Sequence, residues 1–170
     1  RPVLAVIGVL LVVSTVLFLR NDREHEWRYY QYAFKKLVAE KFGAEKAKLA
    51  PSGMQQIWVS SLGHADRCVT CHQAVAWKGF EAGDEPFRTH PAEILRTHPP
   101  ERFGCTSCHG GQGWAVDVAP AHGPVEHWEE PLLGEAMGEA YSIVENKKAL
   151  MQINCNVCHR TDIQILDRPR

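Results

Sequence analysis

The first stretch of the chain is continuously apolar, and everything after it is either amphipathic or loop-like. The segment from Pro2 to Leu19 holds 14 hydrophobic residues and lies between Arg1 and Arg20. Its eighteen residues, at about 1.5 Å each in a helix, span roughly 27 Å, close to the hydrocarbon thickness of a bilayer. The pattern predicts a transmembrane anchor helix over residues 1–20, and no later segment is apolar and long enough for a second crossing.

A cleaved signal peptide is the alternative for this segment. It needs a shorter apolar run and a small-x-small cleavage site, whereas residues 16–20 read VLFLR. The flanking charges alone would place the residues after the span in the cytoplasm, where Lys and Arg are enriched. Arg20, Arg23 and Arg28 follow the span, and only Arg1 precedes it. The cysteine chemistry described below argues for export and carries more weight than this short charge count.

A helical stalk is expected over residues 21–50. Apolar side chains recur there at three- and four-residue steps, at Trp27, Tyr30, Phe34, Leu37 or Val38, and Phe42. Gly43 is a suitable stop, and residues 44–50 allow one or two further turns. We expect the aromatic stripe to pack against the domain that follows, with contact to a partner subunit as the alternative.

Residues 51–170 are predicted to form a domain with little regular structure. Residues 54–62 alternate in part and predict a short strand, and residues 91–96 predict a short helix with Pro91 in its first position. Residues 132–154 have apolar side chains on one face and predict a longer helix. Prolines punctuate most of the rest, so the expected fold class is mainly α with extensive loops.

Composition raises the question of what fills the core. Hydrophobic residues make up 45% of the chain, but without the apolar N-terminal run the share falls to about 41%, much of it alanine. With 13 glycines and 10 prolines in addition, a core made of protein alone is doubtful. The net charge of −1 provides no basic field, so no nucleic-acid partner is expected.

All six cysteines lie in three Cys-x-x-Cys-His motifs, at residues 68–72, 105–109 and 155–159. This spacing is the attachment signature of c-type haem, because two thiols three positions apart can form thioethers to the two vinyl groups of one porphyrin. The adjacent histidine then gives its imidazole to the iron. The sequence therefore predicts three covalent haem c groups, attached at Cys68, Cys71, Cys105, Cys108, Cys155 and Cys158, with His72, His109 and His159 as proximal ligands.

Other roles for these cysteines explain the pattern less well. Structural zinc favours paired C-x-x-C motifs that close a four-cysteine site, and six thiols do not divide into such sites. Thioredoxin-type redox pairs need a βαβ context that the pattern lacks, and three disulfides leave the histidine after every pair unexplained. Haem c is attached outside the cytoplasm, so the part after the anchor is expected on the periplasmic side of a bacterial cytoplasmic (inner) membrane. Three porphyrins also provide the missing apolar core.

The second axial ligand of each iron is expected to be histidine in most cases. Six histidines remain after the proximal three, against methionines only at positions 54, 137 and 151, and bis-histidine iron is low-spin with a fairly low potential. His90 and His98 each precede a proline that restricts the backbone, and His122 precedes a glycine that permits close approach. These three are the predicted distal ligands; His64 and His127 are weaker candidates, and His25 is left to solvent.

A glycine-rich run, Gly110 to Gly113 (GGQG), follows the second motif. It is not followed by Lys-Ser/Thr and has no βα unit around it, so phosphate binding is disfavoured. We expect instead that the backbone passes close to a haem here.

Five runs of the chain resemble a family of membrane-anchored multihaem c-type cytochromes of bacteria. The runs are residues 26–31 (EWRYYQ), 66–72 (DRCVTCH), 86–91 (PFRTHP), 98–113 (HPPERFGCTSCHGGQG) and 128–133 (WEEPLL). The likeness covers about residues 22–160, and it implies His90, His98 and His122 as ligand candidates. Such proteins are often associated with quinol-oxidising complexes of the cytochrome bc type. Tetrahaem quinol dehydrogenases with one anchor are a weaker match, because they carry four motifs, the first close behind the membrane.

The resemblance and the motifs together predict a membrane-anchored electron-transfer subunit, with residues 51–170 forming a trihaem cytochrome c domain. It would relay electrons from a quinol-oxidising membrane partner, such as a cytochrome b, to a periplasmic or terminal electron acceptor. No nucleophile or acid–base pair is visible, so it is not expected to be an enzyme on its own. The alternatives are a multihaem reductase of a small nitrogen or sulfur oxyanion and an assembly or scaffold subunit of a respiratory complex.

Overall fold

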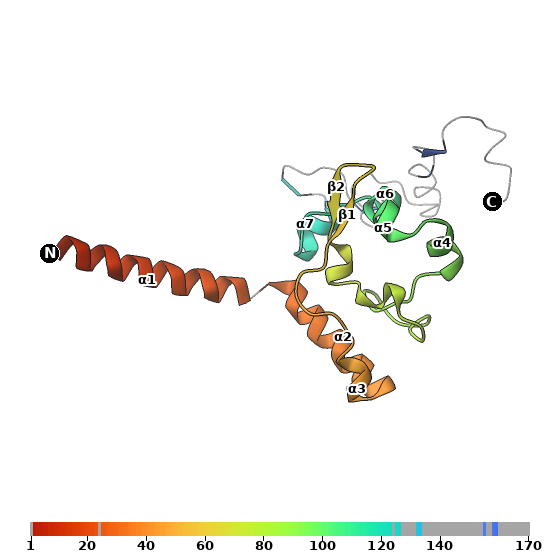
Figure 1. Ribbon diagram of the computed structural model, residues 1–170, viewed down its shortest axis with the longest axis horizontal. Helices are drawn as coiled ribbons and strands as arrows, with labels where there is room; N and C mark the ends of the chain where they lie inside the picture. The colour runs from red at the N-terminus through yellow and green to blue at the C-terminus, as the bar shows by residue number, and fades with distance from the viewer. Residues whose placement is uncertain are drawn as a thin grey trace.

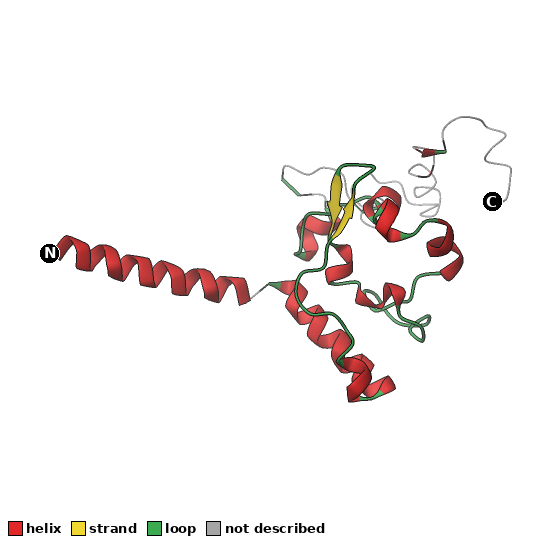
Figure 2. Ribbon diagram, in the orientation of Figure 1, coloured by secondary structure: helices red, strands yellow, loops and turns green. Residues whose placement is uncertain are grey.

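A computed structural model describes residues 2–23, 25–123, 125–126, 132–133, 155 and 158–159. Within these residues the chain is mainly helical, with a single two-stranded sheet and long connecting loops (Figure 2). The coarse expectation of a mainly α chain with many loops is therefore confirmed. The predicted helix over residues 132–154 falls outside the described residues except for Leu132 and Leu133, and so do His127, Met137 and Met151.

The N-terminal helix α1 spans Pro2–Arg23 and projects away from the other elements (Figure 1). It is long and apolar enough to cross a membrane, and none of its residues is buried, unlike those of a core helix in a soluble protein. The hydroxyls of Ser14 and Thr15 donate to the carbonyl of Leu11 at 2.9 and 2.8 Å, so neither polar side chain interrupts the apolar surface. A signal sequence would satisfy the same criteria of length and composition.

The predicted stalk forms α2 (Glu26–Phe42) and the short α3 (Ala44–Ala47). His25 has an extended backbone between α1 and α2, so the chain bends there and does not continue as one helix (Figure 1). Gly43 ends α2 with a φ of 91°, a conformation that glycine adopts without strain. The expected stop at Gly43 is confirmed.

The amphipathic face of α2 forms the core of the described protein. Trp27, Phe34 and Val38 are buried as the spacing predicted, and Gln31 is buried with them. Phe34 lies at the centre, with the rings of Trp77, Phe80 and Phe87 at centroid distances of 5.4, 5.5 and 6.0 Å. The stripe therefore packs against the following part of the chain, as expected, and the stalk shares a core with it.

The rest of the described chain is a β-hairpin followed by short helices. Strands β1 (Ile57–Val59) and β2 (His64–Asp66) pair antiparallel, with Ile57 opposite Asp66. The predicted strand within residues 54–62 is thus confirmed. The short helices are the 3₁₀ helices η1 (Cys68–Thr70) and η2 (Gln73–Ala76), and the α-helices α4 (Ala92–Thr97), α5 (Pro100–Phe103), α6 (Thr106–His109) and α7 (Val118–His122). Helix α4 begins one residue later than predicted, because Pro91 stands just before it as the capping residue.

Candidate haem-binding site

The first cysteine and the histidine of each Cys-x-x-Cys-His motif are joined by the same backbone hydrogen bond. The histidine amide donates to the carbonyl of the first cysteine in each motif, at 3.0 Å for His72, 2.9 Å for His109 and 3.0 Å for His159. Residues three and four positions apart lie on one face of a helical turn. Both cysteines and the histidine of a motif are therefore presented together, which is the arrangement that attachment to one flat ring needs.

Each motif histidine lies next to one of the histidines predicted as distal ligands. The ring centroids are 6.2 Å apart for His72 and His122, 6.1 Å apart for His109 and His90, and 6.0 Å apart for His159 and His98. The rings of a pair are inclined to each other by 70° to 88°. The fold thus forms three separate histidine pairs from residues 19 to 61 positions apart in the chain.

The spacing within the pairs fits two imidazoles on opposite sides of one metal ion. A metal–imidazole nitrogen bond is about 2.0 Å long and the nitrogen lies about 1.1 Å from the ring centre, so such rings have centroids about 6.3 Å apart. Edge-to-face rings in direct contact also have centroids about 4.5–7 Å apart, so the separation is compatible with a metal between the rings and does not by itself require one. The residues present therefore fit a haem iron between each pair.

Three of the rings are oriented through Nδ1, which leaves Nε2 for a metal. Nδ1 of His90 lies 3.2 Å from the carbonyl oxygen of Pro91, and Nδ1 of His98 lies 3.0 Å from the Thr97 hydroxyl. Nδ1 of His72 faces the Glu85 carboxylate at 3.8 Å. Partners of this kind select the tautomer and direction of metal-ligating histidines.

Burial keeps several of these imidazoles in the form that binds metal. Desolvation lowers the pKa of His72, of His109 and of His122 below the ordinary value for histidine. His122 and His109 lower the pKa of His72 further, whereas Glu85 acts in the opposite direction. Neutral imidazole is the ligating species, so at neutral pH these side chains are ready to bind iron without first losing a proton.

The cysteines do not resemble those of a redox-active thiol pair. All six lie within the described residues and none forms a disulfide. A hydrogen bond with Cys105 and burial raise the pKa of the Cys68 thiol, and burial raises the pKa of Cys71 to about 11. Catalytic Cys-x-x-Cys motifs have lowered pKa values instead, so the thioredoxin-type interpretation loses further support.

A carboxylate that the sequence analysis did not single out lies between the first two motifs. Asp66 is fully buried, and its oxygen and the sulfur atoms of Cys68 and Cys105 all lie within 4.8 Å of one another. Such a trio has ligand atoms suited to a metal ion. In the sequence, this group shows only as an aspartate two residues before a cysteine. Its third member, Cys105, lies 39 residues after Asp66 and could not be assigned to it from spacing.

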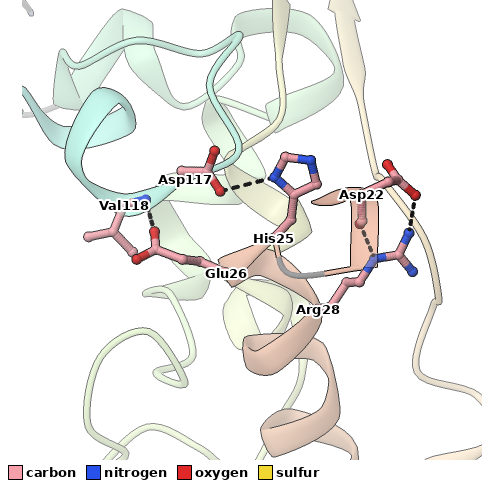
Figure 3. A network of polar contacts seen from close by, with 6 residues as sticks. All are labelled: Asp22, His25, Glu26, Arg28, Asp117 and Val118. Atoms are coloured by element: carbon pink, nitrogen blue, oxygen red, sulfur yellow. Dashed lines mark hydrogen bonds and ion pairs between the residues drawn. The ribbon is translucent and has the colours of Figure 1, made fainter. Parts of the chain in front are cut away.

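A second polar cluster joins the start of α2 to α7 (Figure 3). Nδ1 of His25 lies 3.4 Å from the Asp117 carboxylate, and the Glu26 carboxylate accepts a hydrogen bond from the amide of Val118 at 2.5 Å. Glu26 and Asp117 also contribute to the raised pKa of Cys71, so the first motif lies near this cluster. The expectation that His25 faces solvent is wrong, because the bend before α2 turns its ring toward Asp117.

The glycine-rich run after the second motif is required by close backbone contacts. A Cβ at Gly111 would lie 2.6 Å from the carbonyl oxygen of Ala121, and one at Gly113 would lie 2.7 Å from that of Ala65. The close approach predicted for this run thus occurs between backbone segments, and the predicted approach to a haem stays a prediction. The contact with Ala121 places the loop directly against α7, which carries His122.

Of the weaker ligand candidates, His127 lies outside the described residues, and His64 belongs to no histidine pair within them. Nε2 of His64 is buried without a hydrogen-bond partner in the described part of the chain and lies near Gly104. The side chain of Met54 is about half exposed.

No protein-family model, no curated protein and no solved structure matches the chain.

Proposed function

We propose that the chain is a membrane-anchored electron-transfer protein that carries three covalently attached c-type haems. The first would be held by Cys68 and Cys71, the second by Cys105 and Cys108, and the third by Cys155 and Cys158. The axial ligand pairs would be His72 with His122, His109 with His90, and His159 with His98. When bound, each haem supplies a one-electron Fe(III)/Fe(II) couple; the protein supplies attachment, ligands and burial.

The observation that carries the proposal is the pairing of the histidines. Three motif histidines each lie about 6 Å from a second histidine, and those partners are the three that sequence reasoning selected. Two histidines on each iron favour low-spin iron with a low potential, because a methionine ligand would raise the potential. An iron coordinated in this way has no open position, which favours electron transfer over the reductase alternative.

The contacts between motifs support a linear electron path from the membrane side. The first motif lies beside Glu26, which begins α2 immediately after the anchor helix. The sulfur atoms of Cys68 and Cys105 lie within 4.8 Å of each other, which joins the first motif to the second. Burial raises the pKa of Cys108, and the nearby Cys155 and Cys158 raise it further, which indicates that the third motif lies close to the second. Electrons would enter at the first haem, pass through the second and leave from the third.

The partner and compartment follow from the same chemistry. An exposed apolar helix of 22 residues would anchor the protein in a bacterial cytoplasmic (inner) membrane, with the haems on the periplasmic side, where haem c is attached. A membrane quinol-oxidising protein such as a cytochrome b would deliver electrons. A periplasmic cytochrome or a terminal acceptor would receive them.

The test is production of the full chain in a bacterial host that matures c-type cytochromes, followed by purification in mild detergent. The expected product carries three covalent haems by mass and by pyridine haemochrome absorbance, and its oxidised EPR spectrum shows low-spin iron only. High-spin iron with turnover of nitrite would favour the reductase alternative. A haem-free protein containing zinc would refute the proposal. Copurification with a cytochrome b from the native membrane would support the proposed electron donor.

Single ligand variants test the assigned pairs. His122→Met, His90→Met and His98→Met should each leave three haems attached and raise the potential of one haem. His64→Gln is the matched control, because His64 belongs to no pair and its loss should leave all three potentials unchanged. If His64→Gln shifts a potential and one of the three Met variants does not, the assignment of that pair is wrong.

A further inference from the structure

The buried carboxylate of Asp66 lies between two haem motifs, and the electron path above gives it no task. We infer that Asp66 is a positioning residue that holds the first and second haem sites side by side and, through its negative charge, keeps both haems at low potential. The inference rests on the proposed haem content and goes beyond it, because it assigns a role to a residue that is neither an attachment point nor a ligand.

The hydrogen bonds of Asp66 connect two distant parts of the chain. Oδ1 accepts a hydrogen bond from the amide of Cys68 at 3.1 Å. Oδ2 accepts hydrogen bonds from the amides of Cys105 and Thr106 at 2.7 and 2.8 Å, and from the Thr106 hydroxyl at 3.1 Å. One side chain therefore binds the start of both motifs, and a change in its shape or charge would be felt at both.

The surroundings of Asp66 are built to bring the second motif close. Gly104 has a φ of 69°, and a Cβ there would lie 3.1 Å from Oδ2 of Asp66 and 3.1 Å from the Val59 side chain. A larger residue would push Cys105 away from the carboxylate. With glycine in place, the Cys68 and Cys105 sulfur atoms become neighbours, so two haems attached there would be held in fixed contact, as rapid electron exchange requires.

The charge of Asp66 is not cancelled by a cation. Within the described residues it forms no ion pair, and the guanidinium of the adjacent Arg67 binds Gln56 and the carbonyl of Trp114 instead. Burial acts to raise the pKa of Asp66, but the hydrogen bonds from Thr106, Cys68 and Cys105 outweigh it and hold the pKa below its ordinary range. The side chain is therefore an anion at neutral pH.

A fixed buried anion beside two haem motifs would favour the oxidised, more positive state of the haems that they hold. Electrostatic interactions are strong in a poorly solvated interior, and local charge is one of the factors that set the potential of a haem. The third motif has no contact with Asp66 in the described structure, so its haem should respond least.

The experiment compares potentials in the full, haem-loaded protein in detergent. Asp66→Asn keeps the shape of the side chain and removes its charge; it should leave three haems attached and raise the midpoint potentials of two of them, while the third stays within error. Asp84→Asn is the control, because it removes the same charge at an exposed position. Spectroelectrochemical titration gives the potentials, and EPR gives the magnetic interaction between neighbouring irons, which Asp66→Asn should weaken.

A second variant keeps the inference testable if Asp66→Asn matures poorly. Thr106→Val removes the hydroxyl that donates to Oδ2 and leaves the charge of Asp66 in place. The negative charge is then less compensated by hydrogen bonds, so the midpoint potentials of the first and second haems should fall. Three attached haems with unchanged potentials in both variants would overturn the inference and leave the proposed function intact. A wild-type protein without covalent haem would instead refute the proposed function itself.

Discussion

Gln31 offers the sharpest test of how the first Cys-x-x-Cys-His motif is attached to α2. Its amide nitrogen donates to the carbonyls of Gly53 at 2.7 Å and of Thr70 at 3.0 Å, and its amide oxygen accepts from the Gly53 amide at 3.0 Å. The side chain is 5% exposed. Thr70 lies inside the first Cys-x-x-Cys-His motif, so Gln31 ties that motif directly to α2.

Replacing Gln31 with Met keeps the length of the side chain and removes all three hydrogen bonds. The Gly53 carbonyl keeps a partner in the Gln55 side chain, whereas the Gly53 amide and the Thr70 carbonyl lose the partner described here. A buried backbone group without a partner costs about 1–3 kcal/mol, and the apolar Met offsets a part of this. We expect the free energy of unfolding to fall by about 3 kcal/mol.

The assay is denaturant unfolding of the full chain in detergent, followed by far-UV circular dichroism and by the visible absorbance of the proposed haems. Tyr32→Met is the matched control, because Tyr32 lies on the exposed side of the same helix and its replacement should change stability by no more than about 0.5 kcal/mol. The reasoning is refuted if Gln31→Met unfolds at the same denaturant concentration as the wild type and Tyr32→Met.

Three further outcomes are expected. Phe34→Ala should lower the free energy of unfolding by about 3–5 kcal/mol in the same assay, because it empties the centre of the aromatic cluster; a loss below 1 kcal/mol would contradict the shared core. The pKa of Asp66 is lowered in the folded state. Its ionised carboxylate therefore stabilises the fold above the unfolded-state pKa of about 3.9, and this stabilisation is lost as the pH falls through the folded-state pKa. The stability gap between wild type and Asp66→Asn should therefore narrow below about pH 4, and a constant gap would oppose this assignment. Dialysis against EDTA should leave iron content and visible spectrum unchanged, since thioether-bound haem is not extracted; loss of a metal with unfolding would favour a zinc site instead.

The distribution of apolar residues agrees with the haem proposal. The described aromatic core gathers around Phe34 at the inner face of α2. The three histidine pairs instead belong to short helices and loops that contribute few buried apolar side chains to that core. Porphyrins with large apolar faces would supply the contacts that these segments lack, which explains how a loop-rich chain could hold its ligands in place.

Local features were predictable because they depend on neighbouring residues. The spacing of Trp27, Phe34 and Val38 predicted the buried face of α2, and Gly43 marked its end, because both follow from helix geometry alone. Gln31 was missed since a polar residue within an apolar stripe gives no sign of the carbonyls it will meet. His25 was misplaced for a similar reason, because its orientation depends on the bend between α1 and α2 and on Asp117, 92 residues away.

By itself, the sequence determined the apolar N-terminal helix, the three Cys-x-x-Cys-His turns and a short set of histidines suited to face them. These features are set by composition and by spacing over a few residues, which the local backbone converts directly into geometry. Only the tertiary structure decided that His122, His90 and His98 lie opposite His72, His109 and His159, and that Asp66 joins the first two motifs. Such pairings depend on the path of the chain between distant segments, and that path is set by the joint packing of α2, the hairpin and the short helices.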